Sequence, residues 1–195
     1  MLAKSEHVLL RLQRVQQLHD ELAHRDILSF DLYKRLKHMV LHFYKYAGNI
    51  ERAKETGDSG VLSRILVDTF IICMASANAL NVSLGSKIGK DAESVDHLAK
   101  QLGQEIGSGD LFATAVTELL LIGGQMAKAM ESSDHLERGD PRAEMEKLIP
   151  MLTAKVLGLL GKMGADVEKT VRARLSMVEA KSIFRSLYLV ERKTS

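Results

Sequence analysis

The stretch RILVDTFIICMASANALNVSLG, residues 64–85, decides the fold class of this chain. Apolar and small residues fill it almost without interruption, and their spacing predicts a buried helix over about 61–80. After Arg64, its ionisable side chains are Asp68 and the thiol of Cys73. A buried carboxylate costs several kcal/mol unless a cation pairs with it or it binds a metal. Asp68 is therefore either a satisfied core residue or part of a site.

Helical apolar spacing continues on both sides of this stretch, and no segment alternates as a strand does. The second helix is predicted to begin after Ser29, which would cap it, and the last after Asp166. We expect one all-α domain over residues 1–195, a helical bundle of about six to seven helices. The other helices are predicted over about 5–24, 30–55, 92–106, 111–131, 142–163 and 166–190. The predicted buried stripe of the first helix is Val8, Leu12, Val15, Leu18 and Leu22.

The two halves of the chain share one order of segments. In each half, a long helix ends in small residues, a connector follows, and an apolar helix ends in an Asn or Gly turn, ALNVS (79–83) or KMGAD (162–166). The second set follows the first after about 80 residues, which predicts an internal repeat over 29–106 and 110–190. The alternative is the general likeness of any two helical hairpins.

Composition and charge narrow the classes of function. The formal net charge of +2 is too small to predict a nucleic-acid partner or an acidic membrane. The uncharged run 69–86 nearly reaches the length of a membrane span, but polar residues interrupt it, so we expect no membrane span. One cysteine excludes an intrachain disulfide, and its apolar setting predicts an unreactive thiol in a reducing compartment. Because the start shows no signal-peptide pattern, we expect a cytoplasmic protein.

Polar side chains of the second predicted helix form a candidate site. At helical spacing, His38, His42 and Lys45 lie on one side of this helix, beside its apolar stripe. Asp68, on the neighbouring antiparallel helix, is expected to approach them. Two histidines four residues apart can hold a metal to which Asp68 adds an oxygen ligand, although Lys45 opposes a cation. The favoured alternative is an ion pair of Asp68 with one of three neighbours, Lys45, His42 or Arg64.

The segment LVDTFIICMASANALNVSLGSKI (66–88) and the helix before it resemble the MazG-like family, the all-α nucleoside triphosphate pyrophosphohydrolases. In that family one helix carries ExxE, the next carries ExxD, and a long apolar stretch ends in a turn of the Asn/Leu-Gly-Ile-Asp type. The four carboxylates bind Mg²⁺, which activates water to split the α–β phosphate link of a nucleotide. The resemblance implies an all-α fold and, where the carboxylates are present, this hydrolysis.

The chain departs from the family at most of these positions. Asp68 matches the Asp of ExxD, and its Glu partner falls on Ile65. The ExxE pair falls on His42 and Lys45. In the second half, the corresponding positions fall on Ile122, Gln125, Leu148 and Met151. Seven of the eight expected carboxylates are thus absent, and Arg174 is the basic residue that could match the family's lysine.

Three functions follow as alternatives. The first, which we favour, is a MazG-like protein without standard hydrolysis that binds a nucleotide or another phosphorylated ligand. Its predicted ligand-binding residues are His38, His42, Lys45 and Asp68, with Asp68 as the predicted metal ligand. The second is an active Mg²⁺-dependent pyrophosphohydrolase that uses other carboxylates, namely Glu51, Glu55, Asp58, Glu118 and Glu131. The third is a helical interaction module that forms a homodimer through an exposed apolar face.

Overall fold

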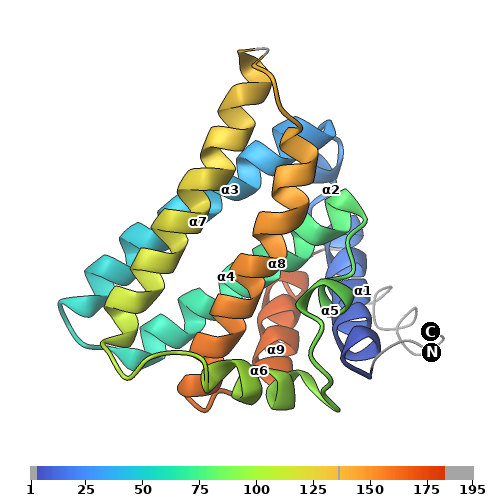
Figure 1. Ribbon diagram of the computed structural model, residues 1–195. Helices are drawn as coiled ribbons and strands as arrows, with labels where there is room; N and C mark the ends of the chain where they lie inside the picture. Colours follow the sequence, from blue (N-terminus) through green and yellow to red (C-terminus); the bar gives the residue numbers. More distant parts are fainter. Residues whose placement is uncertain (1–3, 136, 183–195) are drawn as a thin grey trace.

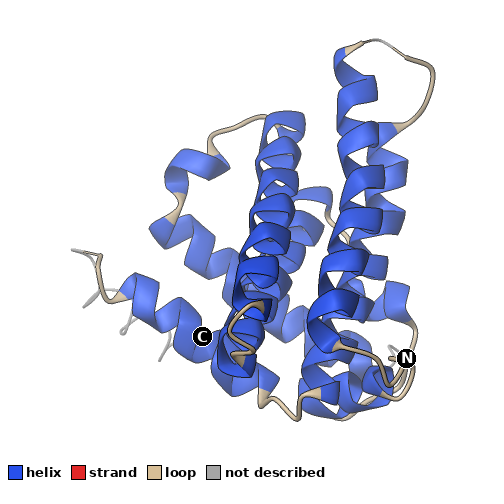
Figure 2. Cartoon of the chain, turned by 90° about the vertical axis from the view of Figure 1, so that its left-hand side faces the viewer, coloured by secondary structure: helices blue, strands red, loops and turns tan. Residues whose placement is uncertain are grey.

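The described chain is all-helical. The computed structural model describes residues 4–135 and 137–182, which contain nine helices and no strand (Figures 1 and 2). The central helices are α3 (Leu32–Lys54), α4 (Ser59–Leu80), α7 (Leu111–Asp134) and α8 (Pro141–Lys162). The others are α1 (Lys4–Ala23), α2 (Arg25–Leu28), α5 (Leu84–Ile88), α6 (Val95–Gly103) and α9 (Val167–Glu179).

The predicted all-α bundle is confirmed, and it has more helices than expected because α2 and α5 are too short to show apolar periodicity. The capping prediction for Ser29 is wrong. Ser29 follows the short α2, and Asp31 caps α3 by accepting a hydrogen bond from the amide of Lys34 at 3.0 Å. Asp166 caps α9 as predicted. The predicted end of the last helix, at about residue 190, lies outside the described residues.

Helix α4 lies at the centre. It packs against α3 and α8, and α7 packs against both of these, so the four helices enclose one apolar core (Figure 1). By length and composition α4 could cross a membrane, whereas α8 and α9 would qualify only as one span bent by 107°. The most apolar window of α4 is 56% buried against its neighbours, which is typical of the core helix of a soluble bundle. Its Cys73 is buried, and burial raises the pKa of this thiol to about 12, as expected for an unreactive thiol.

The remaining long helices cover this core. Helix α1 lies against α4, α5 and α9, and α6 lies across α8. The crossing of α6 and α8 requires a glycine, because a Cβ on Gly161 would stand 1.9 Å from the backbone oxygen of Ala99. Helix α9 contacts both α1 and α4, so segments near the two ends of the described chain lie side by side (Figure 1).

The buried face of α1 differs from the predicted stripe. Val8 and Leu12 are buried as expected, whereas Val15, Leu18 and Leu22 are only half-buried. Polar side chains take the buried positions from the middle of the helix onward, namely Gln13, Gln16, His19 and Asp20. Because buried polar groups need partners, this face of α1 must meet polar groups of its own chain or of a ligand.

Both apolar helices of the predicted repeat end in the same kind of turn. After α4, Asn81 adopts a left-handed φ of 59°, and Ser83 caps α5 two residues later. After α8, Gly164 adopts a φ of 68°, and Asp166 caps α9 two residues later. The ALNVS and KMGAD turns therefore match in conformation, while the repeat over 29–106 and 110–190 stays a prediction.

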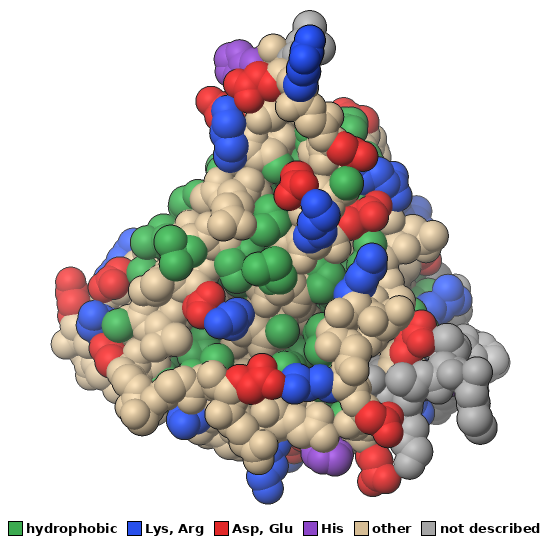
Figure 3. All heavy atoms as spheres, in the orientation of Figure 1, with side chains coloured by type: hydrophobic (Ala, Val, Ile, Leu, Met, Phe, Trp, Pro, Cys, Tyr) green, Lys and Arg blue, Asp and Glu red, His purple; other side chains and the backbone are tan. Residues whose placement is uncertain are grey.

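Large apolar side chains are exposed on three of the central helices. They are Tyr33, Leu41 and Tyr44 on α3, Leu120 and Leu121 on α7, and Met151 on α8. On the face displayed in Figure 3, hydrophobic side chains gather over α7 and α8. The homodimer expected from the sequence would use such a face, and it stays a prediction.

Candidate functional site

Asp68 pairs with Arg174 of α9. Nε and Nη2 of the guanidinium donate to the two carboxylate oxygens at 2.6 and 2.9 Å. An ion pair is thus present, but not with the three partners predicted for it, Lys45, His42 and Arg64. The Asp68 side chain is 22% exposed and that of Arg174 is 45% exposed. The carboxylate is therefore not the buried one that its apolar surroundings in the sequence predict.

The histidines of α3 form a hydrogen-bonded chain with Lys45. The Nε2 atoms of His38 and His42 are 3.2 Å apart, and Nζ of Lys45 lies 2.9 Å from Nδ1 of His42. Because an ammonium group only donates, Nδ1 accepts, and a neutral His42 carries its proton on Nε2. Burial, aided by the charge of Lys45, lowers the pKa of His42 to about 4, so this imidazole is neutral at pH 7. The proton on Nε2 occupies the atom that would bind a metal.

The residues at the family's carboxylate positions do not fit Mg²⁺. Both oxygens of Asp68 are engaged by Arg174, and an imidazole and an ammonium group stand at the ExxE positions. Mg²⁺ needs several oxygen ligands. Three of the alternative carboxylates serve as a helix cap or in surface ion pairs: Asp58, Glu118 and Glu131. Two more line an outer groove of α3, Glu51 and Glu55.

A cavity of about 290 Å³ lies between α1, α3 and α4, beside the connection from α1 to α2. We call it the histidine cavity because four histidines line it, His19, His24, His38 and His42. Its remaining wall is largely apolar and includes Met39, Ile71, Ile72 and Ala75. Of the predicted site residues, His38 and His42 thus line this cavity, whereas Lys45 and Asp68 do not. Neutral imidazole is a common metal ligand, so this lining favours a metal site.

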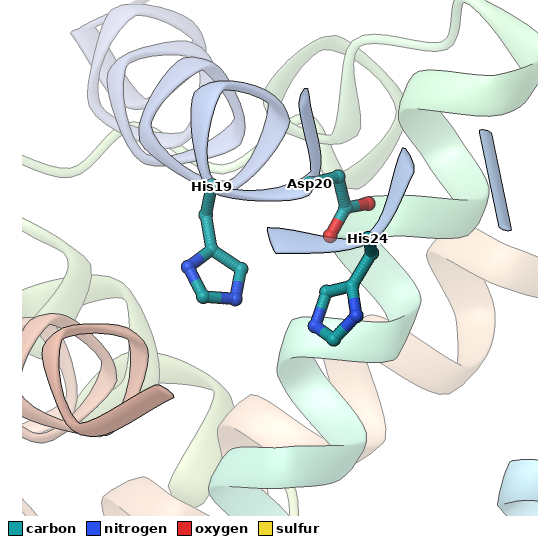
Figure 4. Close-up of side chains that lie close together, drawn as sticks. All are labelled: His19, Asp20 and His24. Atoms are coloured by element: carbon teal, nitrogen blue, oxygen red, sulfur yellow. The ribbon is translucent and has the colours of Figure 1, made fainter. Parts of the chain in front are cut away.

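Three side chains at the histidine cavity converge on one space. His19, Asp20 and His24 have their ligand atoms within 4.8 Å of one another (Figure 4). Two nitrogen ligands of one tetrahedral Zn²⁺ lie about 3.3 Å apart, so a small inward rotation would close the group around an ion. His19 and Asp20 are buried, and His24 is half-buried. In residues 4–135 and 137–182, no other three His, Cys, Asp or Glu side chains converge in this way.

Two charged side chains lie beside these groups. Nδ1 of His19 lies 3.0 Å from Oε1 of Glu179, a buried carboxylate on α9. When His19 is neutral, a carboxylate that accepts the Nδ1 proton leaves Nε2 unprotonated, which is the arrangement that orients histidine ligands of metals. Nη2 of Arg35 lies 3.5 Å from Oδ2 of Asp20. Burial lowers the pKa of Arg35, and Asp20 opposes that change.

The convergent group on α1 is not among the residues predicted from the sequence. The predicted buried stripe of α1 consists of apolar residues alone, so it includes neither His19 nor Asp20. A usable signal is present in HDELAH (19–24), which holds two histidines and an aspartate within two helical turns. That spacing alone is weak, because Glu179 and the α3 histidines come from distant parts of the sequence.

Comparisons with known proteins add no relative. No family model, no curated protein and no solved structure matches this chain. The functional argument therefore depends on the geometry of the site, and the MazG-like resemblance stays an expectation.

Proposed function

We propose that this protein binds a divalent transition-metal ion at the end of α1. The proposed ligands are Nε2 of His19, a carboxylate oxygen of Asp20 and a ring nitrogen of His24. The convergence of these three side chains beside a cavity carries the proposal. Two imidazoles and one carboxylate are donors that suit Zn²⁺, Co²⁺ or Fe²⁺. Mg²⁺ and Ca²⁺ prefer oxygen ligands and fit this set poorly.

The buried charges around the group favour a cation. Asp20 and Glu179 are 7% and 6% exposed, and Arg35 is the cation beside Asp20. Two buried carboxylates, one of them a proposed ligand, thus lie at this group, and buried carboxylates are costly without positive charge nearby. A divalent ion adds positive charge beside them. The competing arrangement is a protonated His19 paired with Glu179, in which no metal binds.

Three protein ligands leave a coordination position open. Structural zinc sites have four protein ligands, whereas sites with three bind water or another small molecule in the fourth position. His19, Asp20 and His24 all line the histidine cavity, so a ligand in that cavity can reach the proposed ion. The function that these features support is a metal-binding protein whose ion takes a small ligand.

The family resemblance contributes an expectation of fold to this proposal. We propose no pyrophosphohydrolysis at the matched positions, because Asp68 is held by Arg174 and its neighbours there are not carboxylates. A phosphorylated ligand at His42 and Lys45 would have to replace the hydrogen bond between these two side chains. We propose a cytoplasmic location on the basis of the single buried thiol of Cys73.

Thermal unfolding of the metal-free protein with added Zn²⁺, Co²⁺ or Mg²⁺ tests metal binding. An ion at 100 times its Kd stabilises the fold by about 2.7 kcal/mol, so we expect a higher Tm with Zn²⁺ and Co²⁺ but not with Mg²⁺. His19→Ala should abolish this rise. His7→Ala, which removes an exposed histidine of the same helix, should leave it unchanged. The proposal is wrong if no transition metal raises the Tm, or if both variants behave alike.

A further inference from the structure

A chain of amide side chains fixes the orientation of Gln16 at the wall of the histidine cavity. The backbone amide of Leu84 donates to Oε1 of Gln13, and Nε2 of Gln13 donates to Oδ1 of Asn78. Nδ2 of Asn78 donates in turn to Oε1 of Gln16 at 2.8 Å. Gln13 and Asn78 are therefore each held with the oxygen toward one neighbour and the nitrogen toward the next, and the oxygen of Gln16 is fixed toward Asn78.

This chain ends at a donor without an acceptor. Gln16 is fully buried and lines the histidine cavity, and its Nε2 has no hydrogen-bond partner among the described residues. A buried donor left unpaired costs free energy, which an oxygen acceptor in the cavity would recover. This observation is independent of the convergence of His19, Asp20 and His24, and it points to a ligand in the same space.

The rest of the cavity wall is largely apolar, which indicates a ligand with an apolar part. Ile71, Ile72 and Ala75 of α4 and Met39 of α3 line the cavity. Its volume of about 290 Å³ is at the lower end for ligand sites. A molecule of a few carbon atoms with one oxygen-bearing end suits a space of this size and lining.

The proposed ion indicates the kind of oxygen that such a ligand offers. A carboxylate oxygen is a usual ligand of Zn²⁺, so an anionic oxygen suits the open position on the ion.

We propose that the histidine cavity binds a short-chain monocarboxylate. One carboxylate oxygen takes the open position on the metal ion, and the other accepts a hydrogen bond from Nε2 of Gln16. The alkyl chain lies against the apolar wall of α4. This inference rests on the proposed function, since it names the class of ligand that the metal ion takes.

The test uses the full chain loaded with Co²⁺, whose visible absorption reports a change of ligand, and adds acetate, propionate or butyrate. We expect a saturable spectral change, with affinity rising about fourfold for each added methylene group. Butanamide, which has the same shape and no charge, should leave the spectrum unchanged. Equal binding of butanamide, or butyrate binding no tighter than acetate, overturns the proposal.

A variant of Gln16 separates this inference from metal binding itself. Gln16→Glu keeps the acceptor for Asn78 and replaces the unpaired donor with a negative charge. It should retain Co²⁺ and bind butyrate at least about tenfold more weakly. Gln17→Glu, a change on the same helix at a residue outside the cavity, should alter neither affinity, and the Tm of each variant verifies folding.

The outcomes distinguish the two proposals. If Gln16→Glu retains Co²⁺ and binds butyrate as the natural chain does, the carboxylate proposal is wrong and the metal site stands. If the natural chain shows no Co²⁺ absorption bands in the visible range, the metal site is wrong and the carboxylate proposal fails with it.

Discussion

Two pairs of histidines face one cavity, and they differ in the charged group that contacts Nδ1 of one ring in each pair. Nδ1 of His19 meets the carboxylate of Glu179 at 3.0 Å, while Nδ1 of His42 meets the ammonium of Lys45 at 2.9 Å. In the neutral rings, the carboxylate leaves Nε2 of His19 unprotonated, whereas the ammonium keeps the proton of His42 on Nε2. We infer that the residue in contact with Nδ1 of a histidine, more than the spacing between two histidines, determines which pair can hold a metal.

The pairs differ also in their nearest carboxylate. Asp20 converges with His19 and His24, and Arg35 lies 3.5 Å from one of its oxygens. Asp68, expected to serve the α3 pair, has both oxygens bound by Arg174. A charged partner at a longer distance leaves a carboxylate oxygen open to an ion, and a bidentate arginine does not.

The largest expected effect concerns Asp20, the charged metal ligand proposed beside His19 and His24. Asp20→Asn should weaken Zn²⁺ binding by roughly 100-fold or more, since it removes the anionic ligand and leaves Arg35 uncompensated. Asp26→Asn removes the same charge from an exposed residue of the same cavity and should change the affinity little. Competition with a chelator measures both values. Equal losses in the two variants would show that the ion responds only to the overall charge of the cavity.

A smaller loss of Zn²⁺ affinity is expected when Glu179, the carboxylate in contact with Nδ1 of His19, is changed. Glu179→Gln should weaken Zn²⁺ binding by about 10- to 100-fold, because the histidine loses the partner that orients it and raises its basicity. Glu168→Gln, on the same helix but paired with Arg172 at the surface, is the matched control. An unchanged affinity in Glu179→Gln contradicts the comparison of the two histidine pairs.

The Asp68–Arg174 pair should matter for stability and not for the metal. Both side chains are partly exposed, so Asp68→Asn should lower the free energy of unfolding by about 1 kcal/mol in urea denaturation. Zn²⁺ affinity should not change. A loss of several kcal/mol would indicate the buried carboxylate that the sequence predicts, and a loss of metal affinity would join Asp68 to the site.

The smallest expected effect is the lowered pKa of the His42 imidazole. In NMR titration its imidazole should become protonated only at about pH 4, because burial and the charge of Lys45 disfavour the cation. Its stabilising contribution is then present above its unfolded pKa of about 6.5 and is lost as the pH falls toward 4. Lys45→Met should raise this pKa. A value near 6.5 in the natural chain would contradict the proton arrangement assigned to the α3 pair.

The fold class could be predicted because it depends on apolar periodicity, which is local. Helix α4 shows this most plainly, since its uninterrupted apolar face requires burial wherever the other helices lie. Asp166 could be assigned as a cap from its position before a periodic segment. Ser29 could not, because the four-residue α2 before it gives no periodic signal.

The site could be predicted only in part, because its contacts join distant segments. Spacing four apart brings His38 and His42 together, as any helix does. The partner of Asp68 is 106 residues away and that of His19 is 160 residues away, both on α9. Where α9 packs cannot be read from the periodicity of α1 or α4, so neither partner follows from the local sequence.

The most direct test compares Co²⁺ binding by the natural chain with two double variants, His19→Ala/His24→Ala and His38→Ala/His42→Ala. The absorption bands of bound Co²⁺ and the number of ions per chain are measured for each protein. We predict one ion per chain in the natural protein and in the α3 variant, and none in the α1 variant. Co²⁺ retained by the α1 variant and lost from the α3 variant would contradict the central claim.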